Sequence, residues 1–307
     1  MFLRRSVDGS FADAYDLFAV GFANILLGYV YYPGAGKLPD SIDLGIKMAS
    51  SVGTVIGQIS FGIFNDVYGR RVVIAPFHLR DLTTQMYGRE LVIMIIATLG
   101  LTLGTTGQSV NVVGVTIFWR FILGIGIGGD YPNSCVLVSE FSTVRWRGAM
   151  MAAMFSAQGL GAFFAALVSY SCAVGFRNDI QGSNCDETCQ LALDKAWRIV
   201  YGMGILPAVG ALFFRLTIPE TIRYTLDVAR NEPIAARDAR QFIKTNDTTH
   251  FGQSLDLPGG FQAPPRPSFR DFRRYFGLWK NGKVLLGTAG SWFLLDIAFV
   301  FPSSGRR

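Results

Sequence analysis

The most informative stretch of the sequence is Gly124-Ile125-Gly126-Ile127-Gly128-Gly129-Asp130-Tyr131-Pro132, which lies inside an apolar run from Val112 to Val138. A run of this length can cross a bilayer as one helix. An acid in such a run costs roughly 2.5–3.5 kcal/mol on insertion scales, so Asp130 is a candidate functional residue that must face protein or water rather than lipid. The alternative is a structural aspartate that caps a helix end near the cytoplasmic interface.

The glycines of this stretch predict close helix packing. Gly124 and Gly128 share one face of a helix, so a neighbouring helix can approach closely there. The pattern Gly124-x-Gly126-x-x-Gly129 also matches the dinucleotide-binding fingerprint. That fingerprint requires a preceding strand and a helix that begins within it. Because the surrounding run is continuously apolar, the sequence argues against a nucleotide site and predicts one uninterrupted helix.

The composition is that of a membrane protein. Of the 307 residues, 50% are hydrophobic and 16% are charged, and the mean hydropathy is positive. The formal net charge of +6 does not indicate nucleic-acid binding, because the basic residues fall between apolar runs, as membrane topology requires. The two histidines and four cysteines show no metal-ligand spacing, and we find no phosphate loop or Ser/His/Asp set. We therefore expect no metal, no cofactor and no enzyme activity.

Seven apolar runs are long enough to span a bilayer. They lie near residues 11–32, 43–65, 88–108, 111–138, 148–173, 197–217 and 284–301. Basic residues concentrate before the first run, after the second, after the fourth and after the sixth, which places the amino terminus in the cytoplasm. The only close cysteine pair, Cys185 and Cys189, then falls in an outer loop, where a disulfide is permitted.

These runs divide the chain into three segments. Residues 1–217 form a six-helix transmembrane bundle, residues 218–283 a polar cytoplasmic connector with a surface helix near 226–244, and residues 284–307 a seventh helix. The layout resembles that of a major facilitator transporter whose second bundle has barely begun. The predicted fold class is an all-α polytopic membrane protein, with the amino-terminal six-helix bundle of that superfamily and the first helix of the second bundle.

A loop motif supports the same assignment. Gly62-x-x-x-Asp66-x-x-Gly69-Arg70-Arg71 lies between the second and third runs and resembles the loop motif of the superfamily. It differs at Val67, where arginine is common. A tight turn of this kind lets the aspartate hold a neighbouring helix end. We assign Asp66, Gly69, Arg70 and Arg71 a gating or structural role rather than substrate binding.

Five further segments narrow the resemblance to one group of transporters. In chain order they are Asp13-Ala14-Tyr15-Asp16-Leu17-Phe18, Gly128-Gly129-Asp130-Tyr131-Pro132, Trp146-Arg147-Gly148-Ala149 with Gln158-Gly159, Pro219-Glu220-Thr221, and Trp292-Phe293-Leu294-Leu295-Asp296. Together they resemble the fungal and plant high-affinity proton-coupled inorganic phosphate transporters over nearly all of residues 11–299. The resemblance implies a multi-pass protein of the plasma membrane whose partners are inorganic phosphate, protons and the lipid bilayer.

The resemblance also implies roles for individual residues. The phosphate-contacting positions are Tyr131, Gln158, Trp292 and Asp296, and the proton-coupling positions are Asp13, Asp16 and Asp130. A protonated Asp296 would donate a hydrogen bond to a phosphate oxygen and release its proton once the site opens inward. The same chemistry would serve any anion, so the choice of phosphate comes from the resemblance alone.

The residue pattern alone leaves two roles undecided, that of Asp13 and Asp16 and that of Arg120. Asp13 and Asp16 share a helical face, but at the start of a helix beginning near residue 11 they could simply favour the helix dipole. Arg120 precedes Asp130 by about 15 Å along one helix, so it is not its direct partner. A structural ion pair with an acid of another helix and a role in the proton path are equally compatible with Arg120.

Two segments depart from the family pattern. Residues 72–85 interrupt the junction between Arg71 and Met86, and residues 300–307 replace the family sequence after Phe299. Both begin with a valine, whose codons start with GT, so retained introns would explain them; a natural short form is the alternative.

We expect a proton:phosphate symporter sequence, with this chain as an inactive fragment. The alternatives are a major facilitator transporter for a sugar or another organic solute and a membrane half that binds without transporting.

Overall fold

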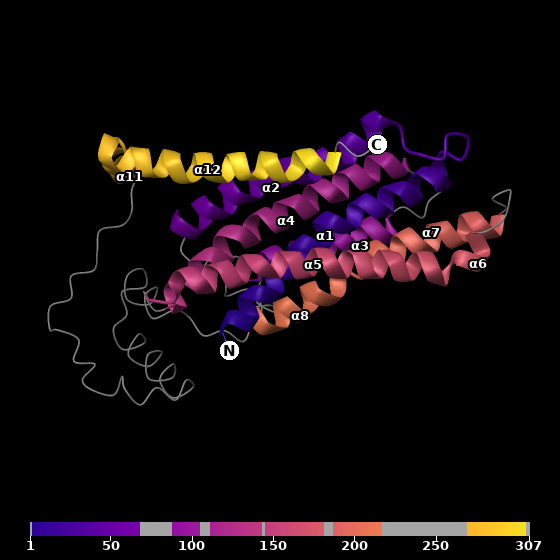
Figure 1. Cartoon of the computed structure of the whole chain (residues 1–307), viewed down its shortest axis with the longest axis horizontal. Coiled ribbons are helices and arrows are strands. Elements are labelled where there is room, and N and C mark those ends of the chain that lie inside the picture. The colour runs from indigo at the N-terminus through magenta and orange to yellow at the C-terminus, as the bar shows by residue number, and fades with distance from the viewer. Residues whose placement is uncertain are drawn as a thin grey trace, which may run out of the picture.

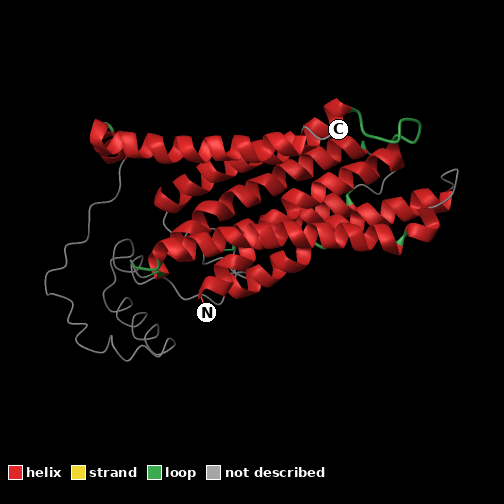
Figure 2. Cartoon of the chain, viewed as in Figure 1, coloured by secondary structure: helices red, strands yellow, loops and turns green. Residues whose placement is uncertain are grey.

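The computed structural model describes residues 2–67, 88–104, 111–142, 145–180, 187–216 and 269–304, and every regular element in these ranges is a helix (Figure 2). The predicted insert at 72–85, the connector helix at 226–244 and the motif residues Gly69, Arg70 and Arg71 lie outside the described residues. Asp66 lies in the last turn of its helix, and its side chain is outside the described part of the chain.

Most of the helices pack in an elongated bundle, and the last long helix runs along one edge of it in Figure 1. The helices are α1 (Phe2–Tyr31), α2 (Asp40–Val67), α3 (Arg89–Leu103), α4 (Val112–Phe141), α5 (Arg147–Gly175), α6 (Arg177–Ile180), α7 (Glu187–Gly202), α8 (Ile205–Leu216), α11 (Phe269–Phe276) and α12 (Trp279–Ser304). By length and composition, four described stretches can cross a membrane: Gly9–Tyr31, Val112–Ser139, Arg147–Gly175 and Thr188–Arg215. The glycine-rich stretch lies wholly inside α4, which agrees with the rejection of a nucleotide site.

Two helices begin earlier than the apolar runs predict. The sixth crossing begins at Glu187 rather than near residue 197 and is broken between α7 and α8 at Met203 and Gly204. The first turns of α7 carry charged residues, so the apolar run begins later than the helix. These turns nevertheless contain the buried residues Cys189 and Leu193. The first helix begins at Phe2 rather than near residue 11.

The early start of α1 corrects the helix-dipole interpretation of Asp13 and Asp16. The field of a helix end falls off within its first turn. Asp13 lies about three turns and Asp16 about four turns beyond Phe2, in the interior of α1. Their burial therefore needs partners on other helices.

Glycines bring α2 and α4 into backbone contact. A Cβ atom at Gly124 would collide with the carbonyl oxygen of Ser50, and one at Gly128 with that of Thr54. The approach is reciprocal, because a Cβ at Gly53 of α2 would meet the backbone of α4. The close helix approach predicted at Gly124 and Gly128 is confirmed.

Two hydrophobic clusters fill the bundle. One joins α1 to α7 and includes Tyr15, Ala19 and Trp197. The other joins α1, α3, α4 and α8 and includes Ala12 and Ile127. Along α1 the change from one cluster to the other occurs around Asp13 and Asp16, so both acids lie between two apolar layers.

The ends of the α7–α8 pair define the two ends of the bundle. Cys189 near the start of α7 is disulfide-bonded, whereas Cys135 and Cys172 are free; Cys185 lies outside the described residues. Arg215 lies in the last turn of α8. We refer below to the Cys189 end and the Arg215 end.

Candidate functional site

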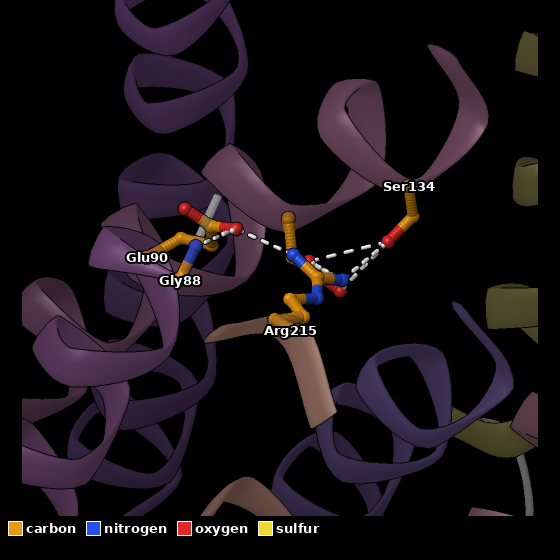
Figure 3. Close-up of polar contacts among 5 residues, drawn as sticks. Gly88, Glu90, Ser134 and Arg215 are labelled. Atoms are coloured by element: carbon orange, nitrogen blue, oxygen red, sulfur yellow. Dashed lines mark hydrogen bonds and ion pairs between the residues drawn. The ribbon is translucent and has the colours of Figure 1, made fainter. Parts of the chain in front are cut away.

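A buried cluster of charges surrounds Arg215 (Figure 3). Its guanidinium forms ion pairs with Glu90 of α3 and Asp130 of α4. It also donates a hydrogen bond of 2.6 Å to Ser134 Oγ. Ser134 Oγ in turn lies 3.2 and 3.3 Å from the two carboxylate oxygens of Asp130. Arg215 and its three partners are at most 1% exposed, so water does not screen these charges.

Local helix chemistry places each member of this cluster. Gly88 precedes α3 in a left-handed conformation, with φ of 110°, and its backbone N–H donates to Glu90 Oε1 at 3.0 Å. Glu90 thus lies in the first turn of α3 and Arg215 in the last turn of α8, where an acid and a base each complement the helix dipole. Asp130 and Ser134 are four residues apart and share one face of α4.

The helix α1 completes the cluster. A Cβ atom at Gly9 would meet both the Arg215 guanidinium and the Asp130 carboxylate, so the α1 backbone passes directly beside the ion pair. One turn later, buried Asp13 lies in the electrostatic field of Asp130 and Arg215. Neither of its carboxylate oxygens accepts a hydrogen bond from a described residue. Three carboxyl groups therefore share one guanidinium, and a bound proton would offset the excess negative charge.

Arg120 forms a second buried site with Asp16. Its Nη1 donates to the backbone oxygen of Asp16 at 3.1 Å, and its guanidinium lies 5.9 Å from the ring centroid of Tyr201. Asp16 Oδ2 has no hydrogen-bond partner among the described residues. A Cβ atom at Gly204 would touch Asp16 Oδ1, so the break between α7 and α8 lies against this carboxylate. The direct partner of Asp130 is thus Arg215, and the role assigned to Arg120 stays a prediction.

The predicted phosphate-contacting residues gather on α4, α5 and α12. Gln158 Nε2 donates to the Tyr131 hydroxyl at 2.8 Å. Phe155, one turn before Gln158, packs against Trp292 with ring centroids 5.3 Å apart. Trp292 is 51% exposed. Asp296 follows one turn later on α12, and its side chain is outside the described part of the chain.

Sequence reasoning missed three members of the Arg215 cluster: Glu90, Ser134 and Arg215 itself. A buried ion pair at Arg215 could have been predicted, because a cation in the last turn of an apolar run needs an acidic partner in the membrane. Glu90 gave a weaker indication, because it opens an apolar run and looks like a residue of the preceding loop. Nothing in the spacing identifies Arg215 as the common partner of Glu90 and Asp130.

A polytopic helical bundle with buried ion pairs between its helices is typical of a membrane transporter. A family model described as "Sugar (and other) transporter" matches residues 5–251, and the chain belongs to this family.

Solved structures of the same superfamily share the fold. The proton:xylose symporter XylE bound to 6-bromo-6-deoxy-D-glucose matches with a TM-score of 0.61 at 19% identity, over 79% of this chain and 49% of that one. The partially occluded inward-open xylose transporter XylE from E. coli matches with a TM-score of 0.59 at 21% identity, over 80% and 55%. The predicted all-α major facilitator fold is confirmed.

Curated relatives are more similar in sequence. The chain is 42% identical over 300 residues to the repressible high-affinity phosphate permease of Neurospora crassa, covering 95% of this chain and 50% of the permease. It is 40% identical over 305 residues to the inorganic phosphate transporter PHO84 of Saccharomyces cerevisiae, covering 95% and 49%. The inorganic phosphate transporter 1-1 of Oryza sativa subsp. japonica is 35% identical, with 95% and 53% covered. The predicted resemblance is confirmed, and the chain spans about half the length of these relatives.

Proposed function

We propose that the chain is part of a protein that transports inorganic phosphate by proton symport. The observation that carries this proposal is the 42% identity over 95% of the chain with a phosphate permease. Residues 1–217 act as the amino-terminal bundle, residues 218–283 as the cytoplasmic connector and residues 284–307 as the start of the second bundle.

Phosphate binds between α4, α5 and α12 in this proposal. Tyr131, Gln158 and Trp292 carry hydroxyl, amide and indole donors, which can bind anionic oxygens without a full positive charge. The 2.8 Å contact from Gln158 to Tyr131 and the packing of Trp292 on Phe155 support one shared binding region. Asp296 supplies a carboxyl group there that must be protonated to donate to phosphate.

Protons are carried by the acids of α1 and α4. The coupling groups are Asp13, Asp16 and Asp130, to which we now add Glu90 as the second acid paired with Arg215. The excess of buried carboxyl groups over the guanidinium supports proton binding at this end of the bundle. Asp66 of α2, with Gly69, Arg70 and Arg71, acts as a gate between helices.

The cysteines and α1 support the proposed membrane orientation. A disulfide at Cys189 favours an oxidising compartment for that end. The early part of α1 lies beside Arg215, because Gly9 packs directly against the Arg215 guanidinium. This part of α1 therefore lies at the Arg215 end of the bundle, opposite the Cys189 end. The amino terminus is cytoplasmic and the membrane is the plasma membrane.

A chimera tests this function. Residues 1–299 replace the matching half of the Neurospora crassa permease, and the chimera is expressed in cells that lack phosphate uptake. We expect uptake of labelled phosphate that depends on the proton gradient and is competed by arsenate but not by hexose. The matched control carries Asp130→Asn in the same chimera. Uptake competed by hexose and indifferent to arsenate would refute phosphate as the substrate.

Sugar transport is the alternative favoured by the description of the family model. A parallel assay with labelled hexose separates the two substrates, because a sugar transporter would accumulate the hexose and not the phosphate. Binding of phosphate by the chimera without uptake would instead favour a membrane protein that does not transport.

A further inference from the structure

A chain of polar side chains leads inward from the surface at the Cys189 end. Lys47 and Asp43 of α2 form an ion pair of 2.6 Å, with side chains 49% and 33% exposed. Asp43 Oδ1 also accepts a 2.7 Å hydrogen bond from Asn24 Nδ2 of α1, which is buried. Asn24 Oδ1 accepts the hydroxyl of Tyr201 of α7 at 3.5 Å. We call Asp43, Asn24 and Tyr201 the outer polar chain.

The outer polar chain ends at Arg120. The Tyr201 ring faces the guanidinium at 5.9 Å, within the range of a cation–π interaction. The Tyr201 ring also packs edge-on against the Trp197 ring, with the two ring centroids 6.1 Å apart. Arg120 then donates to the backbone of Asp16. Four helices thus contribute in turn: α2, α1, α7 and α4.

The order of donors and acceptors in this chain is fixed. An ionised Asp43 can only accept, so Asn24 must present its amide nitrogen there and its oxygen to Tyr201. The Tyr201 hydroxyl is then held as a donor, which fixes the height of its ring beside Arg120. Buried Asn24 and Tyr201 lie among apolar residues such as Leu27, where an unpaired polar group would be costly.

We propose that Asn24 and Tyr201 are positioning residues that set Arg120 against Asp16, with Asp43 as their anchor at the surface. The charged groups that face Tyr201 are Arg120 from α4, Asp16 from α1 and Asp43 from α2. The proposal rests on the proposed function only where it gives Asp16 a part in proton coupling. The positioning itself is a property of the bundle.

Infrared spectroscopy of the purified 307-residue chain in lipid vesicles tests the positioning. Carboxyl bands are followed against pH, and the band lost in Asp16→Asn is assigned to Asp16. Tyr201→Leu removes both the ring and the hydroxyl, so Arg120 loses its fixed position beside the Asp16 carboxylate. The titration midpoint of that band should then shift by about 0.5 pH units, because the charge of Arg120 acts only on the ionised form of Asp16. Tyr201→Phe keeps the ring and should produce a smaller shift in the same direction. Asp43→Ala, at a partly exposed position, should also shift it.

Two controls match these changes. Ser169→Ala removes another buried hydroxyl, which lies on α5 and donates to the Ala165 oxygen at 2.7 Å. Lys47→Ala removes the other partner of Asp43 without touching Asn24. Neither should shift the band. The proposal is overturned if Asp43→Ala and the folded Tyr201 variants titrate like these controls. No phosphate or transport enters the measurement, so failure of phosphate uptake by the chimera is scored separately.

Discussion

Arg215→Met tests whether one guanidinium holds the inner cluster together. The substitution keeps an unbranched side chain of similar length and removes the only charge that the described structure pairs with both Glu90 and Asp130. Both carboxyl groups are fully buried. Removing one partner of a buried pair typically costs about 3–5 kcal/mol, because the remaining charge is left without compensation. Since two acids lose their partner at once, we expect the upper part of this range.

Glu90→Gln removes less. The glutamine oxygen can still accept from Arg215, and the Arg215–Asp130 pair remains, so we expect a loss of about 1–2 kcal/mol. Combining the two substitutions removes a charge of each sign. The double variant should therefore be more stable than the sum of the single losses predicts, by about 0.5–3 kcal/mol.

Lys47→Met is the matched control. Lys47 pairs with Asp43 at 2.6 Å, but the two side chains are 49% and 33% exposed. A pair of this kind contributes about 0–1 kcal/mol. The free energy of unfolding is measured for each variant by titration with a denaturing detergent in mixed micelles. Equal losses for Arg215→Met and Lys47→Met, together with additivity of the Glu90 and Arg215 substitutions, would refute the assignment of Arg215 as the common partner.

Three further predictions concern transport and packing. Asp130→Asn in the permease chimera should abolish uptake or its dependence on pH, and parental uptake at every pH would leave Asp130 a structural role. Asp296→Asn should abolish phosphate uptake at an unchanged membrane level, because an amide donates a hydrogen bond but releases no proton; undiminished pH-dependent uptake would contradict this. Gly128→Leu should sharply lower the yield of folded chain on size-exclusion chromatography, since its Cβ meets the Thr54 backbone, whereas Gly21→Leu, with open space beside it, should be tolerated.

Sequence reasoning predicted the packing of α4 because spacing alone carries it. Two glycines four residues apart must share a helical face, whatever the rest of the fold. The partner helix was also readable, since Gly53 and Gly57 of α2 have the same spacing, and a Cβ at either would collide with the α4 backbone. A close contact between two helices can thus be predicted from the glycine spacing in each of them.

The partners of the buried charges could not be predicted in the same way. The cost of burying Asp130 implies that a partner exists, but not that it is Arg215, which only the packing of α8 brings near. The apolar run predicted near residues 11–32 agrees with the span Gly9–Tyr31, but the helix itself begins earlier, at Phe2. Hydropathy reports where a helix enters the apolar layer, whereas the hydrogen-bonded helix continues through polar residues back to Phe2.

The two acids predicted to share one face of α1 belong to two different charge sites. Asp13 and Asp16 are separated by a rise of about 4.5 Å along the helix. Asp13 lies beside the Asp130–Arg215 pair, and Asp16 beside Arg120. Both guanidinium groups come from other helices, α8 and α4, while both acids belong to a single helix. A displacement of α1 relative to α4 therefore changes the surroundings of both carboxyl groups together, whereas a displacement of α8 alone moves only the guanidinium beside Asp13.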